Sequence, residues 1–231
     1  MKLVRRIIFL IMLVVMSIGF LVIGNGYDMY KKAIDEMPIV EKINSIKQKD
    51  NYTKFEELPQ MYIDAVISVE DHRFYEHNGI DLIAIGRASI NDIKAMKYVE
   101  GGSTITQQLC KNIYFTQEKK FNRKVAEVFM AFELEKQYDK KEIFELYINT
   151  SYFGDGYTTA KEACRGYFHK ELNEMTDGEC VLLAGIPNAP SVYAPTKNPD
   201  LAKQRQKQVL KKMTKYKYLT EQEAEKISQE K

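Results

Sequence analysis

The chain has 231 residues, 45% of them hydrophobic, and a formal net charge of +2 at pH 7. This length predicts one domain plus an appendage, and the near-neutral charge gives no general reason to expect nucleic acid as a partner. The three cysteines have no CxxC spacing and lie in apolar or helical contexts, which predicts small core residues. The three histidines are too scattered for a zinc site.

An uncharged run of 18 residues, Ile7 to Gly24, lies near the start of the chain and is just long enough to cross a bilayer as a helix. A cleaved signal peptide is the alternative, but its apolar region is normally about 7–15 residues long and precedes a small-residue cleavage site. Here the run ends in GNGYDMYKK, which favours an uncleaved anchor. Lys2, Arg5 and Arg6 precede the run, so the positive-inside bias predicts a cytoplasmic N-terminus and an extracytoplasmic remainder.

The expected organisation has three parts. Residues 1–25 form a cytoplasmic stub and transmembrane anchor, residues 26–55 form a polar juxtamembrane connector, and residues 56–231 form one domain. From Glu56 onward the apolar pattern is nearly continuous and helical, and long alternating runs are absent. The prediction is therefore a mainly α fold.

A pair of acids, Glu70 and Asp71, ends a strongly patterned helical run. Apolar residues recur at helical spacing from Tyr62 to Ile67, and Glu70 falls on the same face, seven residues after Ile63. A carboxylate in a core position costs free energy unless it is paired, neutralised or opens into a cleft. Glu70 is thus the first catalytic candidate. The alternative is a helix end open to solvent, and the spacing alone supports both interpretations equally.

Gly101 and Gly102 precede Ser103 and Thr104, which predicts a capped helix N-terminus. Its exposed amides would suit an anion such as phosphate. The alternative is an ordinary capped helix after a turn, and a Gly-Gly-Ser sequence alone does not exclude it.

Glu127 lies in a helix expected from Arg123 to about Tyr138. The main buried face of this helix is expected to comprise Val125, Val128, Phe129 and Phe132. Glu127 points nearly opposite, inside a second apolar stripe made by Met130, Ala131 and Leu134. The alternative to a functional role is an i, i+4 pair with Arg123, worth about 0.2–0.5 kcal/mol, and we favour function.

A basic helix is expected from Leu201 to Lys217. Such a charge run is usually a solvated face, but in a tethered protein it could also lie against anionic lipid headgroups.

Five motifs follow one another along the chain. They are Glu70-Asp71-x-x-Phe74-x-x-His77-x-Gly79, GGSTITQQLCKN (Gly101 to Asn112), Arg123-Lys124-x-x-Glu127, Glu145-x-Tyr147-x-Asn149 with Tyr152-Phe153-Gly154, and LAGIPNAPS (Leu183 to Ser191). Their order and spacing resemble the peptidoglycan glycosyltransferases, the lysozyme-like family 51 enzymes that polymerise lipid II. These enzymes occur alone or as the N-terminal domain of class A penicillin-binding proteins. Departures are few, such as Tyr157-Thr158-Thr159 where the family often has Tyr-Gly-Ile.

The resemblance implies a lysozyme-like glycosyltransferase domain behind a single N-terminal transmembrane helix. Lipid II would be polymerised into linear β-1,4 glycan strands, with inversion at the donor anomeric carbon and release of undecaprenyl diphosphate. Glu70 would be the general base and Glu127 the second essential carboxylate. The substrate-binding positions implied are Asp71, Phe74, Ser103, Gln107, Gln108, Lys111, Lys119, Arg123, Lys124 and Asn188. The family also implies a mobile segment, here Leu82 to Glu100.

No metal site and no required cofactor are expected, and a divalent cation (Mg²⁺ or Mn²⁺) at the diphosphate is the open alternative. The expected partners are lipid II, the growing lipid-linked strand, the bacterial cell membrane and other wall-synthesis proteins, without nucleic acid. A Ser-x-x-Lys occurs at Ser228 to Lys231 with nothing after it, so we expect the monofunctional, membrane-anchored form without a transpeptidase domain.

Two rival functions stay open. A membrane-tethered, lysozyme-like glycan hydrolase also needs two carboxylates, but it has no diphosphate to stabilise and would leave the basic residues idle. A catalytically silent scaffold of wall synthesis is the other class, although both glutamates are present.

Overall fold

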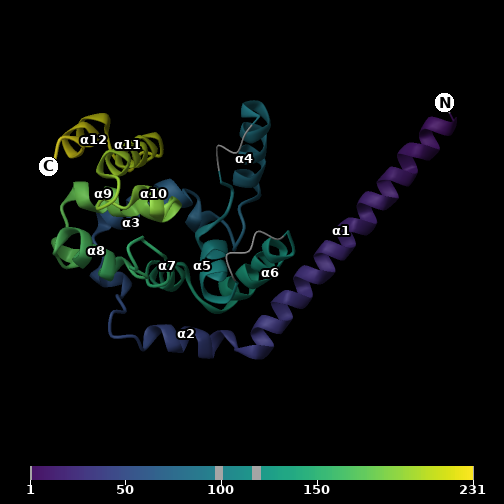
Figure 1. Ribbon diagram of the computed structural model, residues 1–231, viewed down its shortest axis with the longest axis horizontal. Helices are drawn as coiled ribbons and strands as arrows, with labels where there is room; N and C mark the ends of the chain where they lie inside the picture. Colours follow the sequence, from purple (N-terminus) through teal and green to yellow (C-terminus); the bar gives the residue numbers. More distant parts are fainter. Residues whose placement is uncertain (1, 97–100, 116–120, 231) are drawn as a thin grey trace.

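The computed structural model describes residues 2–96, 101–115 and 121–230, and helices and turns build this part of the chain (Figure 1). The α-helices are α1 (Lys2–Glu36), α2 (Ile39–Lys47), α3 (Gln60–Glu70), α4 (Leu82–Ala95), α5 (Ile105–Tyr114), α6 (Phe121–Gln137), α7 (Lys140–Ile148), α8 (Ala160–Phe168), α9 (Asp177–Gly185), α10 (Pro190–Tyr193), α11 (Pro199–Lys215) and α12 (Glu221–Ser228). Short 3-10 turns are η1 (Phe55–Glu57), η2 (Phe74–Glu76), η3 (Leu172–Glu174) and η4 (Ile186–Asn188). The described residues form an isolated β-bridge, Gly154 with Tyr157, and no strand. The mainly α fold predicted from the sequence is confirmed.

Helix α1 extends far beyond the domain, with its N-terminal end pointing away from every other helix (Figure 1). It is long and apolar enough to cross a membrane, and its most apolar 18-residue window is not buried by the protein. Gly26 is the first buried residue of the helix. The helix does not stop at the end of the apolar run but continues without interruption to Glu36.

The segment expected to be a connector contributes to the core. Ile39, Ile43 and Ile46, at helical spacing on α2, are buried in the same apolar cluster as the residues of α3 and α7. Lys47 on α2 forms a 3.1 Å ion pair with Glu142. The packed domain therefore begins near Ile39, and the boundary expected at residue 56 falls inside it.

The centre of the domain is built by α3, α5, α7 and α9. Helix α3 packs against α9 and α11, while α5 packs against α6 and α7. The largest fully buried side chains of the domain include Tyr62 on α3, Phe144 and Tyr147 on α7, and Phe74 on η2. Because α3 packs against the buried residues of α9 and α11, its C-terminal residue Glu70 is held at the point where the core meets a cleft.

Helix α4 stands out from the rest of the domain (Figure 1). Asp81 caps it by accepting hydrogen bonds from the amides of Ile83 and Ala84, both at 2.9 Å. Leu82 and Ile93 are 71% and 76% exposed. The segment expected to be mobile thus contains a helix over Leu82–Ala95, whereas residues 97–100 lie outside the described part of the chain.

The buried face of α6 differs from the predicted one. The residues that face α5 and the core are Ala126, Glu127, Met130, Ala131 and Leu134, so the stripe containing Glu127 is the main buried face. The stripe expected to be buried is only partly so, and Phe132 is 38% exposed. The prediction was wrong because α1 covers this second stripe, which made α6 apolar on two sides.

Candidate active site

A cleft of about 910 Å³ opens between the C-terminal end of α3, the base of α4, and helices α5, α6 and α11. Its size suits a substrate larger than a single sugar. Of the predicted site residues, those that line it are Glu70, Asp71, Ser103, Gln107, Gln108, Lys111, Arg123, Lys124, Glu127 and Asn188. Residues spread over more than a hundred positions of the sequence are therefore brought to one place.

Glu70 presents a carboxylate with one engaged oxygen and one oxygen without a hydrogen-bond partner in the described structure. Gln108 Nε2 donates to Oε2 at 2.8 Å, and Oε1 is buried but accepts no hydrogen bond. Burial raises the pKa of Glu70, and the Gln108 hydrogen bond and the charges of Arg205 and Lys111 oppose this rise. A desolvated carboxylate with an unused oxygen is suited to accept a proton from a substrate.

Arg205 on α11 is a site residue that the sequence analysis missed. Its Nη2 lies 4.0 Å from Glu70 Oε1, and both side chains are largely buried, at 12% and 9% exposure. Its Nε donates to the carbonyl of Gly185 at 3.2 Å, and its guanidinium lies over the Tyr193 ring. The basic run of α11 was expected to be a solvated face or to lie against lipid headgroups, yet Arg205 of that run turns into the cleft. Val209 and Met213 on the same helix pack into the core.

The second carboxylate, Glu127, is 2% exposed and faces a cation with each oxygen. Arg123 Nε lies 3.2 Å from Oε1, and Lys124 Nζ lies 2.8 Å from Oε2. Lys124 Nζ also donates to Ser103 Oγ at 2.7 Å. These contacts fix the N-terminal turn of α6 against the Gly101–Ser103 segment and leave a cationic surface in the cleft.

Lys111 extends this cationic surface from α5. Burial lowers the pKa of Lys111, the charge of Glu127 opposes that effect, and Arg123 and Lys124 add to it. A partly buried cluster of cations with one buried carboxylate is prepared for an anionic ligand, because a bound anion relieves the repulsion among the cations.

Asp71 lines the cleft, but its carboxylate already has partners within the protein. His77 Nε2 lies 3.0 Å from Oδ2, and the amide of Ile105 donates to the same oxygen at 3.0 Å. The amide of Gln107 is also taken, by Thr104 Oγ1 at 3.1 Å. Of the two interpretations left open by the sequence, these contacts favour the ordinary capped helix over the anion site, because the Asp71 carboxylate occupies the place of the anion.

One further predicted position, Phe74, does not line the cleft, and another, Gln107, lines it but also has a structural role. Phe74 is 0% exposed and packs against Phe144 in the core, so its expected contact with substrate is corrected to a structural role. Gln107 closes the capping box of α5 by accepting the amide hydrogen bond of Thr104 at 3.2 Å. Lys119 lies outside the described residues, so its predicted contact with the diphosphate stays a prediction.

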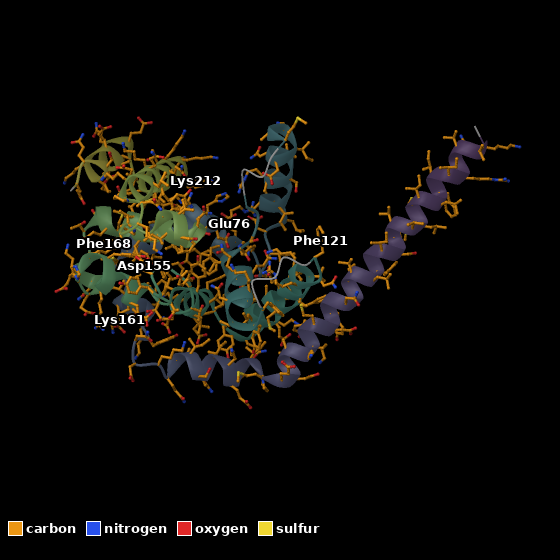
Figure 2. All side chains as sticks on the ribbon, viewed as in Figure 1. Glu76, Phe121, Asp155, Lys161, Phe168 and Lys212 are labelled. Atoms are coloured by element: carbon orange, nitrogen blue, oxygen red, sulfur yellow. The ribbon has the colours of Figure 1, made fainter. Side chains whose placement is uncertain are left out.

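Across the cleft mouth, α4 and α11 are joined by side chains that the sequence did not single out. The His72 ring stacks on the Tyr216 ring with 4.0 Å between centroids, and Arg87 Nη1 lies 3.4 Å from His72 Nε2. Burial, followed by the charge of Arg87, lowers the pKa of His72. Figure 2 shows Lys212, another residue of the cleft, on α11 above the body of the domain.

The donor set does not fit a resident divalent cation. Within the described part of the chain, no three His, Cys, Asp or Glu side chains come together as potential metal ligands. Both oxygens of Glu127 already face cations.

A buried carboxylate with an oxygen that accepts no hydrogen bond shares one cleft with a cluster of cations, an arrangement typical of enzyme sites in which charge develops on a bound group. The chain matches the family model described as Transglycosylase over residues 37–214, and it belongs to that family. Membership makes it a glycosyltransferase, and the family is that of peptidoglycan synthesis.

The relatives agree with this assignment. The chain is 47% identical over 168 residues to penicillin-binding protein 1F of Bacillus subtilis (strain 168), covering 73% of this chain and 24% of that protein. It is 42% identical over 178 residues to penicillin-binding protein 1A of Aquifex aeolicus (strain VF5), covering 77% and 24%. The chain thus spans about a quarter of the length of these relatives.

A crystal structure of penicillin-binding protein 1A from Haemophilus influenzae at 2.6 Å resolution is also similar, with a TM-score of 0.48 and 22% sequence identity. The match covers 78% of this chain and 17% of that one.

Proposed function

We propose that the chain polymerises lipid II into linear β-1,4 glycan strands, inverting the donor anomeric carbon and releasing undecaprenyl diphosphate. The observation that carries this proposal is the buried Glu70 carboxylate, with an unused oxygen in a cleft whose opposite wall is cationic. Membership of the Transglycosylase family supports it at the level of glycan polymerisation.

Glu70 acts as the general base in this proposal. It removes the proton from the 4-hydroxyl of the acceptor sugar as that oxygen attacks the anomeric carbon of the donor. The raised pKa makes Glu70 a stronger base than an exposed carboxylate, and its ionised form is held ready by Gln108 and Arg205. Attack on the face opposite the leaving diphosphate converts an α-linked donor into a β-linked product.

The diphosphate leaving group is stabilised by Lys111, Arg123 and Lys124. Its developing negative charge meets cations that are already fixed by Glu127 and Ser103, so little reorganisation is needed during the reaction. Glu127 acts here by positioning Arg123 and Lys124. No metal or other cofactor is required in this scheme.

Helix α1 and the penicillin-binding relatives indicate a membrane anchor. We further propose that α1 crosses the cell membrane once, with a cytoplasmic N-terminus and an extracytoplasmic domain. The partners then are lipid II, the lipid-linked strand and other wall-synthesis proteins.

The test is incubation of the full chain in detergent with labelled lipid II, followed by separation of the products on a gel. The parent chain should produce a polymer ladder, and Glu70→Gln should reduce the rate by at least about 10²-fold, in the range found for general bases. Glu76→Gln is the matched control, because the Glu76 side chain is 64% exposed. A Glu70→Gln variant with near-normal activity would refute the assignment of the base.

The rival functions correspond to distinct outcomes. Shortening of preformed glycan without polymer from lipid II would establish the tethered hydrolase. Absence of both activities in a folded chain would leave the catalytically silent scaffold.

A further inference from the structure

Helix α1 does more than tether the domain. Its C-terminal part, from Gly26 onward, packs onto α6, the helix that carries the cations Arg123 and Lys124. Gly26 lies so close to α6 that a Cβ there would sit 2.5 Å from Val125 Cβ and 2.9 Å from the carbonyl oxygen of Asn122. Gly24, two residues earlier on the same helix, has nothing within 4 Å of such an atom. Gly24 points to the opposite face of the helix, about 200° away, and on the face that meets α6 the first buried residue of α1 is Gly26, just after the apolar run.

The contact also has a defined register. The Tyr27 ring meets the Phe129 ring edge-on at 5.3 Å between centroids, and Tyr30 lies 5.9 Å from the same ring. One end of the contact is thus Gly26 with Val125 and Asn122, and the next turn of α1 meets the next turn of α6. Interlocking side chains of this kind hold one register, because sliding would open voids. Beyond the end of α1, Tyr114 donates to the carbonyl of Met37 at 3.0 Å, which holds the junction with α2.

This register fixes the position of the cleft along the axis of α1, measured from the end of the apolar run. Gly24 and Gly26 are about 3 Å apart along the helix axis, at about 1.5 Å per residue. Gly26 contacts Asn122, which is followed directly by Arg123 and Lys124. The cations of α6 are therefore held within about one helical turn of the level at which the apolar segment ends.

We infer that the α1–α6 contact fixes the depth of the domain relative to the membrane and holds Arg123 and Lys124 at the level of a lipid-linked diphosphate; this inference rests on the proposed function. The phosphates of such a substrate are attached directly to the lipid chain and lie where the hydrocarbon of the bilayer ends. Arg123 and Lys124 can therefore contact these phosphates while the lipid chain stays in the bilayer and the domain stays at its surface. Figure 2 shows Phe121, at the start of α6, on the side of the molecule from which α1 leaves the domain.

The decisive variant lengthens α1 without touching the contact. Insertion of four alanines after Gly24 raises the domain by about 6 Å and turns it by about 40° relative to the apolar run, while Gly26 and α6 keep their packing. The matched control inserts the same four alanines between Lys2 and Leu3, before the apolar run. We expect the first insertion to slow polymerisation at least about fivefold in lipid vesicles and by less than twofold in detergent, where no bilayer sets the level of the diphosphate. The control should behave as the parent in both.

Depth itself is measured independently of activity. A fluorophore on Phe121→Cys reports the level of α6, because Phe121 is 87% exposed and the three native cysteines are buried. Quenchers on lipid headgroups should quench it in the parent anchor, and the insertion after Gly24 should remove most of that quenching. A label on Lys161→Cys, far from α1 in Figure 2, should be little affected in either chain.

A pair of glycine substitutions tests the contact. Gly26→Ala should force the helices apart and increase hydrogen exchange of the α6 amides around Val125, whereas Gly24→Ala should not. Equal quenching and equal vesicle rates with and without the insertion after Gly24 would overturn the inference. Failure of the parent chain to polymerise lipid II in detergent would instead refute the proposed function, and the quenching would still decide the depth of the domain.

Discussion

The contact of Arg205 with Glu70 leads to a prediction with a distinctive dependence on pH. The charge of Arg205 favours the ionised form of Glu70 and so opposes the rise of its pKa. Arg205→Gln removes that charge, so the pKa of Glu70 should rise further. The acid limb of the kcat/KM profile, which reports the base in the free enzyme, should therefore move to higher pH.

The size of the effect follows from the separation of the two groups. Two unit charges 4.0 Å apart interact by about 4 kcal/mol at an effective dielectric constant of about 20. Both side chains keep some contact with solvent and Arg205 has other partners, so we expect about 1–2 kcal/mol to remain. At about 1.4 kcal/mol per tenfold change, this corresponds to a fall in kcat/KM of roughly 5- to 30-fold on the acid limb.

The assay is the initial rate of polymerisation between about pH 5 and 9, with Lys207→Gln on the same helix as the control. Lys207 lies in a separate groove between α11 and α12. The loss of kcat/KM in Arg205→Gln should become smaller as the pH approaches the alkaline plateau, where Glu70 is ionised in both the parent and the variant. A uniform loss at every pH would assign Arg205 a structural role through Gly185, and an unshifted limb would refute the electrostatic reasoning.

Three further predictions concern stability. Burial raises the pKa of Glu70, so the folded state loses stability as the pH rises from the unfolded-state pKa of this group through its folded-state pKa. Glu70→Gln should therefore raise Tm at pH 7–8, and the gain should shrink near pH 4. A lower Tm of the variant at pH 8 would contradict this reasoning. Gly79→Ala should destabilise the protein more than Gly156→Ala in urea unfolding. Both positions have a positive φ, which costs about 1–2 kcal/mol for a residue with a side chain, but only the Cβ added at residue 79 would crowd a neighbour, 3.1 Å from the Ala131 backbone. Equal losses of stability would refute this steric argument. Phe74→Ala should lower the free energy of unfolding by about 3–5 kcal/mol. Tyr75→Ala should lower it far less, because Tyr75 is 56% exposed. Similar losses would place Phe74 outside the core.

Local patterns anticipated several helices closely. The helix expected from Arg123 to about Tyr138 is α6 (Phe121–Gln137), and the basic helix expected from Leu201 to Lys217 is α11 (Pro199–Lys215). Helical periodicity and end signals are written in neighbouring residues, so they can be recovered without knowledge of the fold. Glu70 was recovered only in part in this way, because its place on an apolar helical face made it a catalytic candidate while a helix end open to solvent explained the spacing equally well.

Contacts between distant segments could not be anticipated in the same way. Arg205 and Glu70 are far apart in the sequence, and nothing in the charge pattern of α11 distinguishes Arg205 from its basic neighbours. The amide of Ile105 donates to the carboxylate of Asp71, which directly follows α3, so a distant residue occupies the helix N-terminus that the local sequence left open to an anion. Phe74 belongs to a motif that suggested substrate binding, yet the neighbouring Phe144 encloses it.

The sequence by itself determined a helical domain, an apolar N-terminal run long enough for a membrane and two carboxylates in apolar surroundings, since each depends on residues within a few turns of one another. The tertiary structure decided which face of α6 is buried, that α2 belongs to the core and that Arg205 reaches Glu70. It also decided that the chain after the apolar run docks on the helix carrying the cations. Those features depend on which surfaces meet, and an amphipathic or doubly apolar helix does not state its partner.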